Sequence, residues 1–177
     1  MPPRRRKDRT LIFPDFPDFR PNVTPAEMFR AGVFGGTYFR PIRSAVTKKR
    51  HSGLRGYPAA WWRGLDTAKV VTASECDRSV NKYGATSGTA LEYWETQGWI
   101  HKQDPYGWVQ WYCRFYLGRR TADDARQIDR WLGVAGTAGR WRRYLANRVA
   151  AGKDSPKVRQ LLLQWAWDPP RAGGRHV

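Results

Sequence analysis

The chain has 177 residues, a net charge of +17 and only two cysteines, Cys76 and Cys113. This length predicts a single domain that can bury a sizeable core, and a charge this large indicates an anionic partner. The cysteines have no neighbours at metal-ligand spacing, which argues against a disulfide framework and against a zinc site encoded by spacing.

The basic residues concentrate at the two ends of the chain. Residues 1–60 carry a net charge of +9, residues 61–120 carry +2, and residues 121–177 carry +6. No apolar run reaches the roughly 18–20 residues that a membrane span needs, and no apolar segment of a secretory signal follows the basic N-terminus. We therefore expect a soluble, intracellular protein without a membrane span.

The first 23 residues combine a basic tip with proline-spaced phenylalanines. The tip contains Arg4, Arg5, Arg6 and Lys7, which we expect to form a mobile basic tail. Repeated X-Pro steps then favour extended backbone. We expect an arm that lays Phe13, Phe16 and Phe19 along the surface, and an arm packed on its own domain is the alternative.

The first predicted helix begins at a capping box. In Thr24-Pro25-Ala26-Glu27, the Thr24 side chain can accept from the Glu27 amide, and the Glu27 side chain can accept from the Thr24 amide. Gly32 is expected to end this helix. The pair Gly35-Gly36 favours a turn with positive φ or a close backbone approach. Further on, residues 68–75 form the only stretch with appreciable strand character.

The C-terminal half is predicted to be a series of capped helices. Their expected starts are Thr86 or Ser87, Asp104-Pro105, Thr121, the vicinity of Thr137, and Ser155-Pro156, and Pro169-Pro170 ends the last one. We therefore expect a mainly α fold, with a single compact domain of about five to six helices over residues 24–168. An extended Pro/Phe-rich arm, residues 1–23, precedes it, and a C-terminal tail, residues 169–177, follows it.

Aromatic residues recur on one face of the helix expected after Asp104. They stand at the i, i+3, i+4, i+7 and i+8 spacing of one helical face: Trp108, Trp111, Tyr112, Phe115 and Tyr116. A continuous exposed stripe of this size is rare in a monomer, so the pattern predicts a core helix. Stacking on bases remains a hypothesis for Tyr106, Trp99 and Trp167, which fall near helix ends.

Basic residues on the predicted helices form the candidate binding surface. Arg140 and Arg143 lie opposite the apolar face of their helix, and Arg142 lies on its flank. On the preceding helix Arg126 and Arg130 point outward together, which indicates either an anionic partner or a pairing of Arg126 with Asp123. The candidate nucleic-acid contacts are Arg4, Arg5, Arg6, Lys7, Arg126, Arg130, Arg140, Arg142, Arg143, Lys157 and Arg159.

The sequence indicates no catalytic residue, cofactor or metal. The three histidines are scattered, and neither a Gly-x-Ser-x-Gly elbow nor an HExxH motif occurs. His101 and Asp104 flank a predicted helix start and could form a dyad, whereas a local side-chain cap is the alternative. Residues distant in sequence could still converge into a catalytic pocket.

Several long stretches resemble a widespread family of small uncharacterised proteins. They include "FGGTYFRPI", "DPYGWVQWYCRFYLGRR" and "SPKVRQLLLQWAW", and the resemblance extends from about residue 13 to residue 167. The resemblance implies no activity and assigns no site residue.

Taken with the charge, these features predict a basic nucleic-acid-binding protein of low sequence specificity, with DNA and RNA both open. The short turn at residues 133–139 also permits a helix-turn-helix arrangement. One alternative is an enzyme that acts on an anionic or nucleotide-like substrate in a Trp/Arg-lined pocket. The other is a structural subunit of a ribonucleoprotein or another larger assembly.

Overall fold

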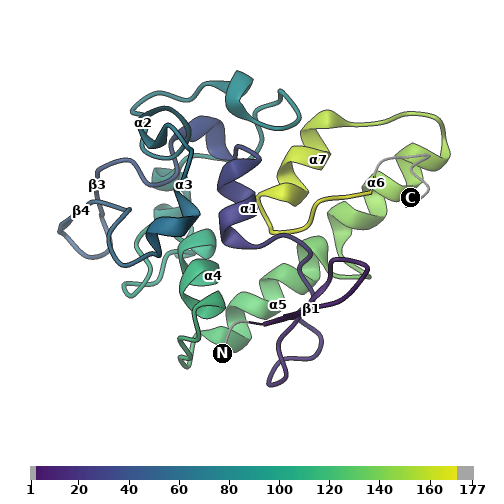
Figure 1. Ribbon diagram of the computed structural model, residues 1–177, viewed down its shortest axis with the longest axis horizontal. Helices are drawn as coiled ribbons and strands as arrows, with labels where there is room; N and C mark the ends of the chain where they lie inside the picture. The colour runs from purple at the N-terminus through teal and green to yellow at the C-terminus, as the bar shows by residue number, and fades with distance from the viewer. Residues whose placement is uncertain (1–2, 171–177) are drawn as a thin grey trace.

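The computed structural model describes residues 3–170, and helices dominate this part of the chain (Figure 1). The helices are α1 (Pro25–Arg30), α2 (Thr67–Val70), α3 (Leu91–Thr96), α4 (Trp108–Tyr116), α5 (Asp124–Ala135), α6 (Arg140–Ala150) and α7 (Pro156–Leu163). Two antiparallel pairs of short strands accompany them: β1 (Arg4–Arg5) with β2 (Leu11–Ile12), and β3 (Ile42–Arg43) with β4 (Arg50–His51). The expectation of a mainly helical fold is confirmed, and the two small sheets are an addition to it.

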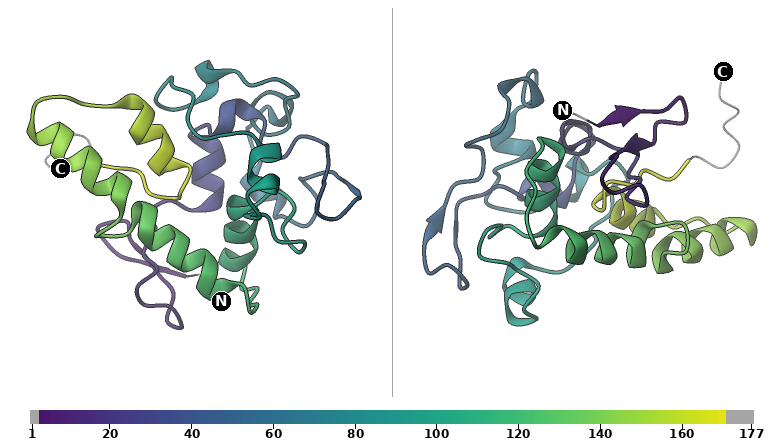
Figure 2. Two further views of the ribbon diagram at one scale, coloured as in Figure 1. Left: turned by 180° about the vertical axis from the view of Figure 1, so that it is seen from behind. Right: turned by 90° about the horizontal axis from the view of Figure 1, so that it is seen from below.

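The helices form a connected series of packed pairs. Helix α1 packs on α4, α4 on α5, α5 on α6, and α6 on α7. Helices α5 and α6 follow one another along one edge of the molecule, and α7 turns back beside α6 (Figures 1 and 2). The β3–β4 hairpin lies at the end of the molecule opposite α6.

The aromatic stripe of α4 is buried, as the sequence predicts. Trp111 and Tyr112 are fully buried, and Phe115 is 1 % exposed. Phe19 inserts between this helix and α5, with ring centroids 5.7 Å from Trp111 and 5.1 Å from Trp131. Edge-to-face and tilted aromatic contacts of this kind stabilise a core beyond the area they bury. Most of the stripe is therefore part of the core, whereas Tyr116 is half-buried and Trp108 also lines a hollow described below.

The N-terminal segment is packed on its own domain, which is the alternative given for the arm, and Arg4 and Arg5 lie in a hairpin where a mobile tail was expected. Arg4 and Arg5 pair with Ile12 and Leu11 in the β1–β2 hairpin. Phe19 is fully buried in the core. Because the segment supplies the ring that fills the space between α4 and α5, it belongs to the fold of the domain.

Two helix starts are confirmed where the sequence places them. The side-chain and backbone bonds of the Thr24–Glu27 capping box are both present, and the Ser155 side chain accepts from the Val158 amide at the start of α7. The turn at Gly35 also behaves as predicted, with φ of 58°. A Cβ at Gly35 would lie 2.2 Å from Cys76 Sγ, so both a positive φ and a close approach exclude a side chain here.

Other element predictions are wrong. Residues 68–70 of the expected strand region belong to the short helix α2, whose Val70 amide donates to the Asp66 carbonyl. Helix α4 begins at Trp108, three residues after the expected start, because the carboxylate of Asp104 is bound by two arginines and Gly107 has φ of 87°. Helices α3 and α6 also begin later than predicted, and α7 ends at Leu163, well before the proline pair.

Residues 171–177 of the expected C-terminal tail lie outside the described residues. Between residues 3 and 170, no helix combines the length and apolar character needed to cross a membrane.

Candidate nucleic-acid interface

Helix α6 carries three arginines close together in its first turn, Arg140, Arg142 and Arg143, and a fourth, Arg148, near its end. Arg140 and Arg143 are exposed, whereas Arg142 is half-buried with its guanidinium 4.3 Å from the ring centroid of Trp167. Burial lowers the pKa of Arg142 from its ordinary value. Within residues 3–170 none of the three forms an ion pair. A shallow hollow of about 410 Å³ lies beside Arg140, Arg143 and Asn147.

The surrounding sequence explains this lack of acidic partners. Between Asp129 and Asp154 the chain contains six basic residues and no acidic one. A helix of arginines without local carboxylates has an uncompensated positive field. Guanidinium groups in this state suit phosphate oxygens, which they can bind with two parallel hydrogen bonds.

The two arginines predicted on α5 have different surroundings. Arg126 Nε donates to Asp123 Oδ1 at 2.5 Å, so the pairing alternative is the one that the structure contains. Arg130 lies with its guanidinium 5.7 Å from the Trp99 ring and 5.5 Å from the Trp165 ring. It donates to Gln127 Oε1 and forms no ion pair within the described residues. Burial, and secondarily the positive charge of Arg126, lower the pKa of Arg130.

The surroundings of Arg159 argue against its expected role as a nucleic-acid contact. This side chain is only 4 % exposed, and its Nε donates to Asp154 Oδ1 at 2.7 Å. Its Nη1 also donates to the Pro170 carbonyl. Asp154 thus occupies the position that a phosphate would take. The Arg159 guanidinium stabilises the fold and is not free to bind nucleic acid. The neighbouring Lys157 is exposed and remains available.

The basic residues of the N-terminal hairpin also divide into two groups. Arg5 Nη1 lies 2.6 Å from Glu27 Oε1, so its charge is compensated within the chain. Arg4, Arg6 and Lys7 are exposed and form no ion pair in the part of the chain that the structure describes.

Two adjoining hollows lie beside α3, and the second of them reaches α6. The first, of about 360 Å³, has Arg40 as its charged residue. The second, of about 330 Å³, has Arg130 and Arg140. Neither is lined by a carboxylate or a histidine among the described residues. They share walls formed by Phe34, Tyr38, Gly88, Thr89 and Trp94.

The second hollow is lined by tryptophans that come from four different segments of the chain. These residues are Trp94, Trp99, Trp108, Trp141 and Trp165. Trp99 is 40 % exposed, whereas Trp108 is 6 % exposed. The hydrogen bond from Trp94 Nε1 to Thr89 Oγ1, at 2.7 Å, fixes one wall. Of the three residues for which stacking was hypothesised, Trp99 lies at this hollow, Tyr106 is buried beside the first hollow, and Trp167 lies under Arg142.

The candidate contacts predicted from the sequence left out a second basic surface, the β3–β4 hairpin. Arg43 and Arg50 occupy opposite positions on the two strands, and the connection between them contains Lys48 and Lys49. All four side chains are exposed and form no ion pair within residues 3–170. The signal was present in the sequence, since eight basic residues and no acidic one separate Glu27 from Asp66.

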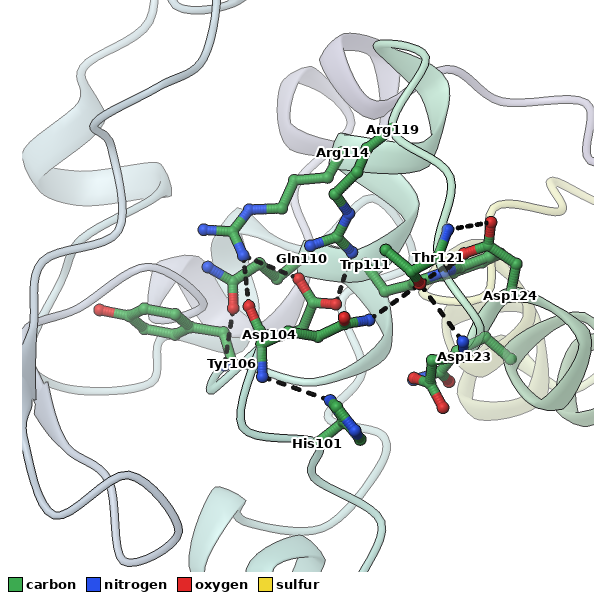
Figure 3. Close-up of polar contacts among 12 residues, drawn as sticks. His101, Asp104, Tyr106, Gln110, Trp111, Arg114, Arg119, Thr121, Asp123 and Asp124 are labelled. Atoms are coloured by element: carbon green, nitrogen blue, oxygen red, sulfur yellow. Dashed lines mark hydrogen bonds and ion pairs between the residues drawn. The ribbon is translucent and has the colours of Figure 1, made fainter.

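The residues considered for a catalytic dyad belong to a buried structural network (Figure 3). Asp104 is fully buried and accepts from Arg114 Nη1 at 2.9 Å and from Arg119 Nη2 at 2.5 Å. The His101 ring accepts from the Gln103 amide, and the side-chain partners of the Asp104 carboxylate are Arg114 and Arg119. This network holds the segments on either side of α4 in place. No group of acidic, histidine or cysteine residues in the described chain could hold a metal ion.

Comparison with models of known families, with curated proteins and with solved structures finds no match.

Proposed function

We propose that the protein binds nucleic acid through its phosphates, with low sequence specificity. The observation that carries this proposal is the set of three arginines on α6, Arg140, Arg142 and Arg143, which have no acidic partner within the described residues. Phosphate neutralisation supplies most of the affinity in binding of this kind and conveys no sequence information.

Two further surfaces support the same proposal. The β3–β4 hairpin places Arg43 and Arg50 opposite each other, an arrangement that repels in the free protein and that phosphates would relieve. Arg4, Arg6, Lys7 and Lys157 add exposed positive charge. We leave Arg5, Arg126 and Arg159 out of the contact set, because carboxylates of the chain already bind them.

An acidic protein or a charged membrane surface would also be attracted to a positive field. The aromatic hollow next to Arg140 favours nucleic acid over both, because bases stack on aromatic rings while their phosphates bind arginine. The same hollow fits the alternative of a Trp/Arg-lined pocket for a nucleotide-like molecule. Since no carboxylate or histidine among the described residues lines either hollow, the lining supports binding more directly than acid–base catalysis.

A salt titration tests the proposal. The logarithm of the affinity should fall linearly with the logarithm of the salt concentration, by about 0.9 per duplex phosphate contacted and about 0.7 per single-strand phosphate. Replacing Arg140 and Arg143 together with Gln should lower this slope by nearly two such contributions. Stability should change little, because both side chains are exposed.

The matched control replaces Arg20 and Arg63 with Gln. These arginines are exposed, carry the same charge and belong neither to α6 nor to the hollows. Equal slopes for the α6 double variant and for this control would remove α6 from the interface. Binding that does not depend on salt would remove the phosphate mechanism altogether.

A further inference from the structure

We infer that the second hollow is a binding site for one unpaired nucleobase, with Arg130 inside the site and Arg140 at its rim. The inference rests on the proposed function and names the part of the nucleic acid that enters the protein. It implies a preference for single strands, or for bases displaced from a duplex, over intact duplex.

The walls of the hollow suit a planar ring. Five tryptophans line it, and the rings of Trp99 and Trp165 both lie close to the Arg130 guanidinium, at 5.7 Å and 5.5 Å. Stacking on aromatic side chains tolerates every base, because each base has a π face. The walls would therefore add affinity without adding sequence specificity.

The size of the hollow also limits what can enter. Its volume of about 330 Å³ is at the lower end of the roughly 300–1,000 Å³ typical of small-molecule sites. A single base or nucleotide matches that volume. A base that remains paired within a duplex is held in its stack and has to leave it before it can enter a concave site.

Arg130 supplies the polar recognition. Its guanidinium donates to Gln127 Oε1, a neutral acceptor, and has no carboxylate partner in the described chain. A guanidinium has five N–H donors, so several remain for the acceptor atoms of a base or for a phosphate oxygen. Arg140, 4.9 Å from the Trp141 ring centroid, stands where the hollow meets the arginine surface of α6.

This combination distinguishes nucleic acid from other anionic or apolar ligands. An acyl chain would match the aromatic walls but would leave the Arg130 charge without a partner. An acidic peptide would satisfy the arginines but would gain little from the tryptophan faces. A base attached to a phosphate satisfies both features at once.

A second aromatic pair extends the site at its edge. Tyr93 on α3 is 45 % exposed and Trp99 is 40 % exposed, and their ring centroids are 5.6 Å apart. Helix α3 projects from the body of the molecule (Figure 2, right). The neighbouring base of a strand whose first base occupies the hollow would meet this exposed pair.

The test compares two single-stranded probes of equal length, an ordinary oligonucleotide and an abasic one with the same phosphates. Affinity is measured by anisotropy at one salt concentration, and base contact is measured by quenching of tryptophan fluorescence. The wild-type protein should bind the ordinary strand about tenfold or more tightly than the abasic strand, and only the ordinary strand should quench strongly.

Trp99→Ala should remove most of this preference and leave the salt dependence unchanged, because Trp99 contributes stacking and no charge. Trp99→Phe keeps an aromatic face and should restore most of the preference. Leu117→Ala, at a residue that is 45 % exposed and lines neither hollow, is the control and should bind like the wild type.

Equal wild-type affinity for the ordinary and abasic strands would overturn the base site and would leave the phosphate proposal standing. Loss of preference in Leu117→Ala as large as that in Trp99→Ala would also overturn it. Failure to bind either strand would instead reject the proposed function on which the inference rests.

Discussion

Trp111 and Asp124 are joined by a buried hydrogen bond that connects α4 to the start of α5. The indole Nε1 donates to Asp124 Oδ1 at 2.8 Å, and the other carboxylate oxygen accepts from the Thr121 amide at 2.9 Å. Trp111 is fully buried and Asp124 is 2 % exposed. The pair therefore connects the core packing of α4 to the turn that precedes α5.

Replacing Trp111 with Ala should lower the free energy of unfolding by about 3–5 kcal/mol, because it leaves a cavity in the core. The loss should be larger than in Trp111→Phe, which fills part of the space and removes only the indole donor. Urea denaturation followed by circular dichroism measures both variants. An unchanged unfolding midpoint together with abolished nucleic-acid binding would show that Trp111 is a binding residue and no core residue.

Features set by neighbouring residues were predictable from the sequence. The Thr24–Glu27 capping box joins residues three positions apart, and the aromatic stripe of α4 follows the period of one helix. Both signals are local, so they can be read without knowledge of the fold. The confirmed start of α7 at Ser155 is of the same kind.

Features set by distant partners were not predictable in this way. Asp104 precedes a proline, as a helix cap often does, but its carboxylate is bound by Arg119, fifteen positions away. Arg159 has the sequence of a phosphate contact, but Asp154 and the Pro170 carbonyl enclose it. The sequence around such a residue is the same whether its side chain is free to bind a ligand or is bound by another part of the chain. Only the folded structure distinguishes the two cases.

The candidate site combines features that neighbouring residues set with features that depend on distant partners. Arg140, Arg142 and Arg143 lie within one helical turn, and the exposure of Arg140 and Arg143 followed from helical periodicity. The second hollow brings together residues as distant as Trp94 and Trp165, and no spacing rule joins them. The Arg43–Arg50 opposition likewise depends on the register of a hairpin in a region where the sequence pattern was weak.

The pH dependence of stability should contain a contribution from Glu27. Burial alone raises the pKa of this carboxyl, but hydrogen bonds from Arg5 and the Thr24 amide outweigh it, so the pKa lies below its ordinary value of 4.5. A lowered folded-state pKa stabilises the protein above 4.5, and the contribution is lost as the pH falls through the folded-state value.

We therefore expect Glu27→Gln to be less stable than the wild type at pH 7, by less than about 1 kcal/mol because the ion pair with Arg5 is partly exposed. The difference should shrink as the pH falls below 4.5. Glutamine can still complete the capping box, so the variant isolates the charge. Urea unfolding of both proteins at a series of pH values measures the difference, and a gap that stays constant down to pH 3 would contradict the assignment.

The last prediction concerns the β3–β4 hairpin. Like charges directly opposite on paired strands destabilise the pair, and an opposite-charge pair contributes roughly 0.2–1 kcal/mol. Arg50→Glu would place a carboxylate opposite Arg43, so the variant should unfold at a slightly higher temperature than the wild type. If the hairpin contacts phosphates, the same change should weaken nucleic-acid binding and reduce its salt dependence.

Arg63→Glu is the matched control for this change, because it alters the net charge equally at another exposed arginine that lies outside the strand pair. A general effect of net charge should lower the affinity of both variants by the same factor. Contact through the hairpin requires a larger loss in Arg50→Glu, combined with the higher unfolding temperature. If Arg50→Glu is more stable than the wild type but binds with the same affinity as Arg63→Glu, the ion pair with Arg43 is confirmed and the hairpin is excluded from the interface. The stability would then depend on the cross-strand pair, whereas the affinity would depend only on the net charge.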